Sequence, residues 1–246
     1  ISNSTSDQSQ AGSAIYTESP FKLSKIRLIN NYNPNNNGTI GYYNYGGNTF
    51  TFDSLIIANN IGGLFNPANS NNSTINLSNS AIIGNTCNTV FNGTNENFQI
   101  TNSTISNNIR SNTGFELSGS STLNINMSNI LESVQNINAS DISDATNNYW
   151  GDASGPYHPS QNPSGQGDSV NIFVNVTPWL TTPNTDAPPI PAQNTTVTGT
   201  GNDFISLKWD TSPLGDLAGY KLYYDSDSSG YPYTNSVDIG TDTSYT

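Results

Sequence analysis

The side chains best suited to chemistry form one small basic group near the start of the sequence. Lys22, Lys25 and Arg27 occupy outward positions of a short repeat unit, and Asp53 lies one unit further on. A polysaccharide lyase needs a base that removes a proton from the sugar and cations that neutralise the uronate carboxylate. Three charges on one solvated strand face also serve solubility alone, because nearby charge does not by itself define a site. The group is therefore a candidate contact for an acidic sugar.

Three tyrosines in the long insert of the same unit extend this candidate site. Tyr42, Tyr43 and Tyr45 carry rings that can stack on sugar rings, and they can equally fold back over the chain. Detectable binding or cleavage of acidic polysaccharides would favour the first alternative.

The remaining titratable side chains match no catalytic pattern. Acidic residues within the repeats occupy different positions of their units, so they form no stacked hydrolase pair: Asp53, Glu96, Glu116 and Glu132. Four later aspartates offer oxygen ligands for calcium but lack regular ligand spacing: Asp141, Asp144, Asp152 and Asp168. His158, the single histidine, has no Ser or Cys partner at a recognisable spacing, and phosphate-loop and zinc spacings are absent. We expect no catalysis and no cofactor, with structural calcium as the one alternative.

Composition bounds the fold and the partners. The 246 residues are 33% hydrophobic and 10% charged, yet they keep 13 Tyr, 9 Phe and 3 Trp, which indicates an ordered chain with a thin core. A net charge of −12 argues against nucleic acid and anionic membranes as partners. No apolar run reaches the length of a membrane span, and the single Cys87 excludes an internal disulfide.

An internal repeat organises the first two thirds of the chain. Five units align in register, starting at positions 21, 50, 75, 98 and 123, and each alternates apolar and polar residues. Short strands recurring every two dozen residues are typical of a solenoid, in which each coil buries its apolar edge against the next. The alignment predicts two internal stacks of side chains, one running from Phe21 through Phe98 to Leu123, and the next from Leu23 through Ile100 to Ile125.

Asparagine recurs at the end of four units, and we interpret it as a structural ladder. Asn tolerates unusual backbone angles in turns, and its amide can bond the amide of the adjacent coil. Ser133 breaks the series at the fifth unit. The predicted ladder is Asn31, Asn60, Asn85 and Asn108.

A distinctive motif follows the repeats, with the pairs Trp150-Gly151, Gly155-Pro156 and Pro178-Trp179. Repeats and motif together resemble the right-handed parallel β-helix repeat proteins, the pectate-lyase-like group that includes many bacterial and archaeal surface proteins. The resemblance covers residues 21–180. It implies a right-handed parallel β-helix over 1–180, closed by a cap at 144–180 in which His158 is structural. A solenoid end exposes unpaired backbone groups, and large indole side chains suit such a cap.

A proline-rich stretch, 181–191, predicts a semi-extended linker to a second module at 192–246. The strand patterns around Trp209 and over 216–224 resemble the first half of a fibronectin type III sandwich, an immunoglobulin-like fold. Its last two strands are missing, so we expect an incomplete module and a chain excerpted from a longer polypeptide.

Together these features favour a non-catalytic extracellular structural or adhesive protein of a cell surface, such as a subunit of a filament or surface layer. Its expected partners are further copies of itself or other surface components. The alternative is binding or lyase-type processing of polysaccharides. Ice binding ranks last, because the outward positions lack regular Thr-X-Thr rows. Asn-X-Ser/Thr triplets are abundant, and five of them are taken as candidate glycosylation sites: Asn37, Asn92, Asn102, Asn126 and Asn175.

Overall fold

The computed structural model describes residues 1, 14–17, 19–33, 39–43, 47–69, 72–110, 114–132, 137–214, 217–226 and 233–246. The chain divides into two compact units, Ile1–Pro188 and Pro189–Thr246. Both units consist of strands and loops, and none of the described residues is helical.

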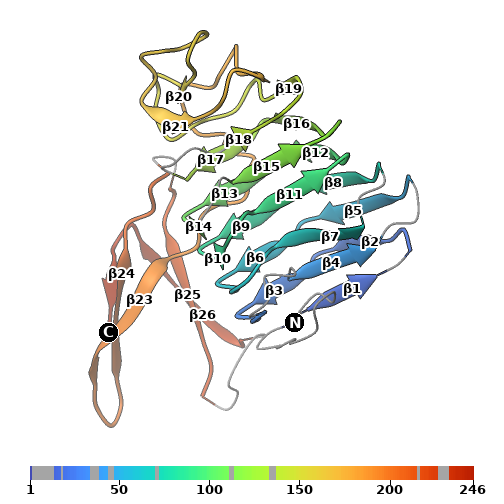
Figure 1. Ribbon diagram of the computed structural model, residues 1–246. Helices are drawn as coiled ribbons and strands as arrows, with labels where there is room; N and C mark the ends of the chain where they lie inside the picture. Colours follow the sequence, from blue (N-terminus) through green and yellow to red (C-terminus); the bar gives the residue numbers. More distant parts are fainter. Residues whose placement is uncertain are drawn as a thin grey trace. The chain divides into compact units, whose positions relative to one another are not determined.

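The first unit is a parallel β-solenoid, as the repeat predicts (Figure 1). Each of the five repeat units contributes one strand to a seven-stranded sheet and one to a five-stranded sheet. The seven-stranded sheet contains β2 (Lys22–Ser24), β5 (Thr49–Asp53), β8 (Thr74–Ser78), β12 (Asn97–Thr101), β16 (Thr122–Asn126), β19 (Ser143–Asp144) and β22 (Val174–Asn175). The five-stranded sheet contains β3 (Arg27–Ile29), β6 (Ile56–Ala58), β9 (Ala81–Ile83), β13 (Thr104–Ser106) and β17 (Asn129–Leu131).

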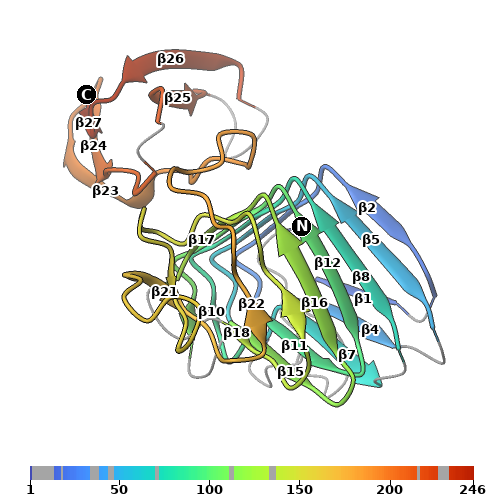
Figure 2. The same cartoon turned by 90° about the horizontal axis from the view of Figure 1, so that it is seen from above.

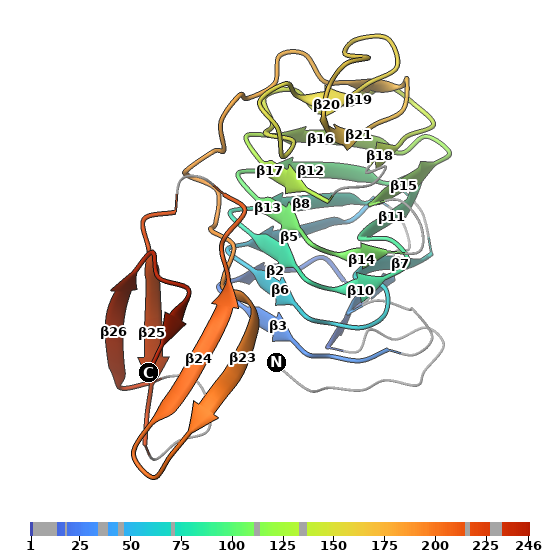
Figure 3. The same ribbon diagram turned by 90° about the vertical axis from the view of Figure 1, so that its left-hand side faces the viewer.

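A third, six-stranded sheet closes each coil. It contains β1 (Ile15–Thr17), β4 (Ile40–Tyr43), β7 (Phe65–Asn69), β11 (Phe91–Thr94), β15 (Phe115–Ser118) and β18 (Ile137–Asn138). The coils are stacked one above another in Figure 3, and Figure 2 shows neighbouring strands of the seven-stranded sheet side by side. Two short pairs complete the unit: β10 (Thr86–Cys87) with β14 (Ile109–Arg110), and β20 (Pro156–Tyr157) with β21 (Gly167–Ser169).

The predicted internal stacks are confirmed by the strand register. Phe98 pairs with Ile75 below and Leu123 above, and Ile100 pairs with Leu77 and Ile125. Each of these side chains is at most 2% exposed. Parallel pairing at one register therefore places like residues over like residues, which is how a thin core remains continuous.

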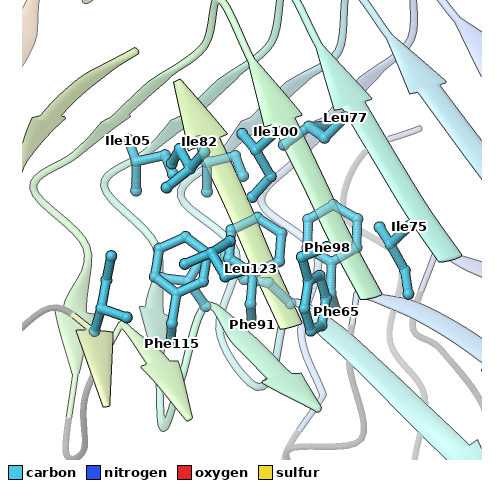
Figure 4. Packing of buried hydrophobic residues seen from close by; sticks show 14 of the residues in the cluster. Phe65, Ile75, Leu77, Ile82, Phe91, Phe98, Ile100, Ile105, Phe115 and Leu123 are labelled. Carbon is cyan, nitrogen blue, oxygen red and sulfur yellow. The ribbon is translucent and has the colours of Figure 1, made fainter. Parts of the chain in front are cut away.

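Aromatic rings from the six-stranded sheet reinforce this core (Figure 4). The rings of Phe65, Phe91 and Phe115 lie one above another, with centroid separations of 4.8 and 4.6 Å. Phe91 also meets Phe98 edge-on at 5.6 Å, so two sheets are joined across the interior. Such ring pairs stabilise beyond simple burial.

Residues with positive φ recur at three corners of the solenoid, which explains the abundance of Asn and Gly. They fall between the seven- and five-stranded sheets (Lys25, Ser54, Asn79, Asn102, Met127), before the ladder (Asn30, Asn59, Gly84, Asn107) and before the seven-stranded sheet (Gly47, Asn72, Asn95, Gly119). The left-handed region favours Gly and Asn. The unusual backbone angles were expected at the ladder asparagines themselves. That assignment was wrong, because the positive φ lies one residue earlier.

The second unit contains two antiparallel sheets. One has the order β23 (Gln193–Thr200), β24 (Ile205–Asp210) and β27 (Ser244–Tyr245), and the other pairs β25 (Tyr220–Tyr224) with β26 (Asn235–Gly240). Trp209 is buried and meets the ring of Tyr220 edge-on at 5.4 Å. This arrangement is compatible with a sandwich of two sheets.

Candidate functional site

The four predicted ladder asparagines form an unbroken row of hydrogen bonds inside the solenoid. Asn31 donates from its backbone N–H and its Nδ2 to Oδ1 of Asn60, at 2.8 and 2.9 Å. Asn60 bonds Asn85 in the same way, and Asn85 bonds Asn108. All four are at most 6% exposed, so each amide satisfies buried backbone groups of its neighbour.

The row continues through two carboxyl groups that were not predicted from the sequence. Asn108 Nδ2 donates to Glu132 Oε1 at 2.5 Å, and the backbone N–H of Glu132 donates to Asp168 Oδ2 at 2.6 Å. Ser133 was expected at the next position of the ladder, and this position was wrong, because Glu132 occupies it. Thr104 pairs with Asn129, 25 residues on, whereas Asn108 bonds Glu132, 24 residues on, because this turn is one residue shorter. Ser133 itself lies outside the described residues.

A second buried row uses serines and was also missed. Ser80 Oγ accepts from the backbone N–H of Leu55 at 3.0 Å, Ser103 Oγ from that of Ser80, and Ser128 Oγ from that of Ser103. Asn148 Oδ1 completes the row by accepting from the Ser128 N–H at 2.9 Å. The coincidence of Ser in the aligned repeats was the available signal.

The described candidate sugar-binding residues come from different sheets of the solenoid. Lys22 lies on β2 of the seven-stranded sheet, Lys25 at the following corner, and Arg27 on β3 of the five-stranded sheet, all exposed. The expectation that they share one strand face was wrong, because the corner at Lys25, with φ 57°, turns the chain between them. The backbones of Tyr42 and Tyr43 belong to β4, on the third sheet. The side chains of these two residues, and all of Tyr45, lie outside the described part.

Asp53 begins an outward row of polar side chains at that same corner. Its Oδ1 accepts from Asn79 Nδ2 at 2.8 Å and from Ser78 Oγ at 2.9 Å. These hydrogen bonds, with Asn79 contributing most, hold the pKa of Asp53 below its ordinary value. Asn79 Oδ1 in turn accepts from Asn102 Nδ2 at 2.7 Å. The carboxylate is thus hydrogen-bonded to the next coil and, through Asn79, connected to the coil after it.

Residues 181–188, called the strap below, run along the same corner and extend this row of hydrogen bonds. Asn184 Nδ2 donates to Asn102 Oδ1 at 2.9 Å and to the Met127 carbonyl at 2.6 Å. Asn184 also exchanges two hydrogen bonds with Asn129, through its backbone N–H and carbonyl. Further down, Thr104 Oγ1 donates to the carbonyl of Pro188. Residues 181–188, part of the predicted linker, are therefore fastened across consecutive coils.

Glu96 is a buried carboxyl group whose acidity is changed strongly. It lies at the corner before β12 and is 0% exposed. Burial raises the pKa of this carboxyl group to about 8, and the neighbouring Ser73 opposes this effect only in part. Its own backbone N–H donates to Ser121 Oγ at 3.0 Å. Glu96 therefore remains protonated at neutral pH, where it contributes no charge.

The cap covers the last coil with the predicted aromatic residues. Trp150 is 0% exposed, and Gly151 and Pro156 lie at the two ends of the loop that follows it. A Cβ at Gly155, where φ is +80°, would lie 2.5 Å from the ring of Trp179. Trp179 Nε1 donates to the Ala153 carbonyl, and the carbonyl of Pro178 accepts from the N–H of Asn147.

The other polar groups of the cap are engaged locally. Nδ1 of the buried His158 accepts from the backbone N–H groups of Ser160 and Gln161, at 3.1 and 2.9 Å, so it shapes a turn. Asp141, Asp144 and Asp152 each accept from backbone N–H groups one or two residues on. Within the described ranges, no three Asp, Glu, His or Cys side chains gather as a metal site.

The candidate glycosylation sites differ in access. Asn92 and Asn175 are exposed, and so are the Thr residues that complete their triplets. The amide of Asn102 is engaged in the row at the strap, and that of Asn126 donates to Asn124 at 3.1 Å. Asn37 lies outside the described residues. Only Asn92 and Asn175 therefore combine a described position with an open acceptor amide.

One shallow groove crosses the outward face of the seven-stranded sheet. It holds about 200 Å³ and is lined by amides and hydroxyls of three coils, mainly Asn76, Ser78, Gln99, Thr101, Asn124 and Asn126. Neutral donors and acceptors of this kind suit hydroxylated ligands. In the part of the chain described, no helix has the length and apolarity to cross a bilayer.

No protein-family model, curated protein or solved structure matches this chain. Its function is therefore inferred from its own residues.

Proposed function

We propose that this chain is a non-catalytic structural or adhesive protein of an extracellular surface, built as a rigid solenoid and acting in a filament or surface layer. The observation that supports the proposal is that polar side chains form rows of hydrogen bonds between successive coils. The rows from Asn31 to Asp168 and from Asp53 to Asn184 link coil to coil. Side chains held in this way stiffen a rod, since each hydrogen bond is buried or shared with a neighbouring coil.

Several further assignments belong to the same proposal. We take the solenoid to be right-handed and related to the pectate-lyase-like β-helices, and the second unit to be a fibronectin type III-like module. Near-absence of Cys and Lys, with two open Asn-X-Thr triplets, supports an extracellular location. Further copies of the chain or other surface components are the partners that this role requires.

Electron microscopy of the native material tests the proposal, at a resolution that shows subunit contacts. A filament or lattice of repeated subunits with solenoids in the contacts is the expected result. Isolated monomers that bind or cleave polysaccharide would overturn it.

Polysaccharide binding is the second candidate, favoured by the neutral groove on the seven-stranded sheet. The double substitution Gln99→Ala and Asn124→Ala removes two of its amides without touching the core. Binding of neutral glycans that this variant loses would favour this candidate.

A further inference from the structure

The strap, residues 181–188, is held to the solenoid by polar contacts that begin at its C-terminal end. The carbonyl of Pro188 accepts a hydrogen bond from Thr104 Oγ1. Two residues earlier in the chain, the carbonyl of Asp186 accepts from Asn102 Nδ2 at 3.0 Å. Thr104 begins β13, and Asn102 lies at the corner between β12 and β13, so both contacts fall on the same coil.

Asn184 forms the next group of contacts, which reach one coil further toward the cap. Its backbone N–H and carbonyl bond the side chain of Asn129 on β17, at 2.8 and 3.0 Å. Its Nδ2 donates to the carbonyl of Met127 at 2.6 Å and to Oδ1 of Asn102 at 2.9 Å. Asn184 is buried, so this one residue is the centre of the attachment.

The chain just before the strap is anchored more firmly, in the cap. The backbone N–H of Leu180 donates to the carbonyl of Asn148 at 2.9 Å. The side chain of Trp179 packs against the apolar core of the solenoid, and its Nε1 donates to the carbonyl of Ala153. Residues 179–180 therefore mark the fixed end of the strap.

Few apolar contacts hold the strap itself. Within 181–188, all of which the structure describes, only Asn184 and Ala187 are buried. The coils beneath it, in contrast, share three continuous sheets and an apolar interior. Segments with few buried apolar contacts open locally at a free energy far below that of global unfolding. The strap can therefore leave the solenoid while the coils stay folded.

The order of the contacts decides how the strap responds to tension. As the chain runs from Leu180 to Pro188, its partners lie successively in the cap, on β17 and on β13. A force that enters through residue 189 therefore reaches the contact of Pro188 first and that of Leu180 last. Each hydrogen bond must break before the next one carries the load. The strap thus peels at a lower force than if all of its contacts were loaded at once.

We propose that the strap is a force-releasable extension: tension between the two units peels residues 181–188 from the solenoid and lengthens the connection while both units stay folded. Eight freed residues span about 27 Å when extended, whereas the docked strap spans two coil spacings, about 10 Å. Release therefore lengthens the connection by about 17 Å. The inference deepens the proposed function and rests on it, since a subunit of a filament or surface layer carries tension.

Force spectroscopy of single molecules of the full chain tests the proposal. The attachment points are Gln99→Cys, on the outward face of β12, and Ala192→Cys, just before β23; both positions are exposed, and the native Cys87 is buried. With this pair, tension passes through the strap without loading the sheets of the second unit. We expect a reversible step of about 17 Å, at a lower force than the long steps that unfold the solenoid. A solenoid that unfolds with no such step before it would overturn the proposal.

Two substitutions in the same molecule assign the step to the strap. Asn184→Ala should reduce the force of the short step at least twofold, because it removes the Nδ2 donor that bonds Met127 and Asn102. Asn175→Ala is the matched control, since Asn175 is exposed on β22 and lies outside the strap. An unchanged force in Asn184→Ala, or an equal reduction in both variants, contradicts the assignment. If microscopy shows the native assembly but the short step is absent, this inference fails while the proposed function stands. If the step is present but no assembly exists, the proposed function fails instead.

Discussion

Replacing Glu96 by Gln should remove a specific pH dependence from the stability of the solenoid. The carboxyl group is fully buried in the folded chain, with a pKa of about 8, against 4.5 for an ordinary glutamate. Because the folded pKa is raised, its contribution to stability is fully present below pH 4.5. That contribution is lost as the pH rises toward 8, since ionisation then favours the unfolded chain.

The magnitude follows from the two pKa values. Each pH unit between them costs up to about 1.4 kcal/mol for one proton. Between pH 5 and pH 8, the free energy of unfolding of the native chain should therefore fall by about 3 kcal/mol relative to Glu96→Gln. Glutamine keeps the size of the side chain and cannot ionise, so the variant isolates this one group.

Urea unfolding at several pH values, followed by tryptophan fluorescence, measures the difference. Glu116→Gln is the matched control, because it removes a carboxyl group from the outward face of β15, where Glu116 accepts from Asn138 at 3.1 Å. The control should follow the pH dependence of the native chain. A difference between native and Glu96→Gln that stays constant from pH 5 to pH 8 would refute the reasoning.

Three further substitutions test the packing and the hydrogen-bonded rows. Asn85→Ala should cost about 3 kcal/mol in urea unfolding, because it strands buried backbone groups on both sides, whereas Asn124→Ala on the outward face should cost less than about 0.5 kcal/mol. Gly155→Ala should lower the midpoint of thermal unfolding more than Gly47→Ala, since both have positive φ but only the first meets an indole ring. Asn184→Ala should cost about 2 kcal/mol and speed proteolysis within 181–190; an unchanged cleavage rate would mean that the strap is not held by this side chain.

The repeat could be predicted from the sequence because its apolar period leaves one register possible. A shift of Phe98 by one residue would turn it outward, so aligned positions must stack. The asparagine ladder follows from the same alignment. The apolar rows and the asparagine row of the solenoid can therefore be predicted from the spacing of residues within the repeat.

Other features could not be predicted because they depend on contacts between distant residues. Asn184 bonds residues 55 and 82 positions earlier, and nothing in a proline-rich stretch indicates this docking. The basic group was expected on one strand face, but a single positive φ at Lys25 separates its members. The lengths of the turns could not be predicted either. The turn before Glu132 is one residue shorter than in the preceding coil, so the repeat alignment did not place Glu132 in the ladder.

That continuation explains how the ladder can stop. Each asparagine accepts through Oδ1 from one coil and donates through Nδ2 toward the next, so an asparagine always needs a further acceptor. Glu132 accepts from Asn108 through a carboxyl oxygen, and its side chain carries no N–H group that would need an acceptor in a further coil. Its backbone N–H, the group left over, is taken by Asp168 from the cap. A change from amide to carboxyl at the last coil thus ends the row without stranding a buried donor, and it joins the solenoid to its cap.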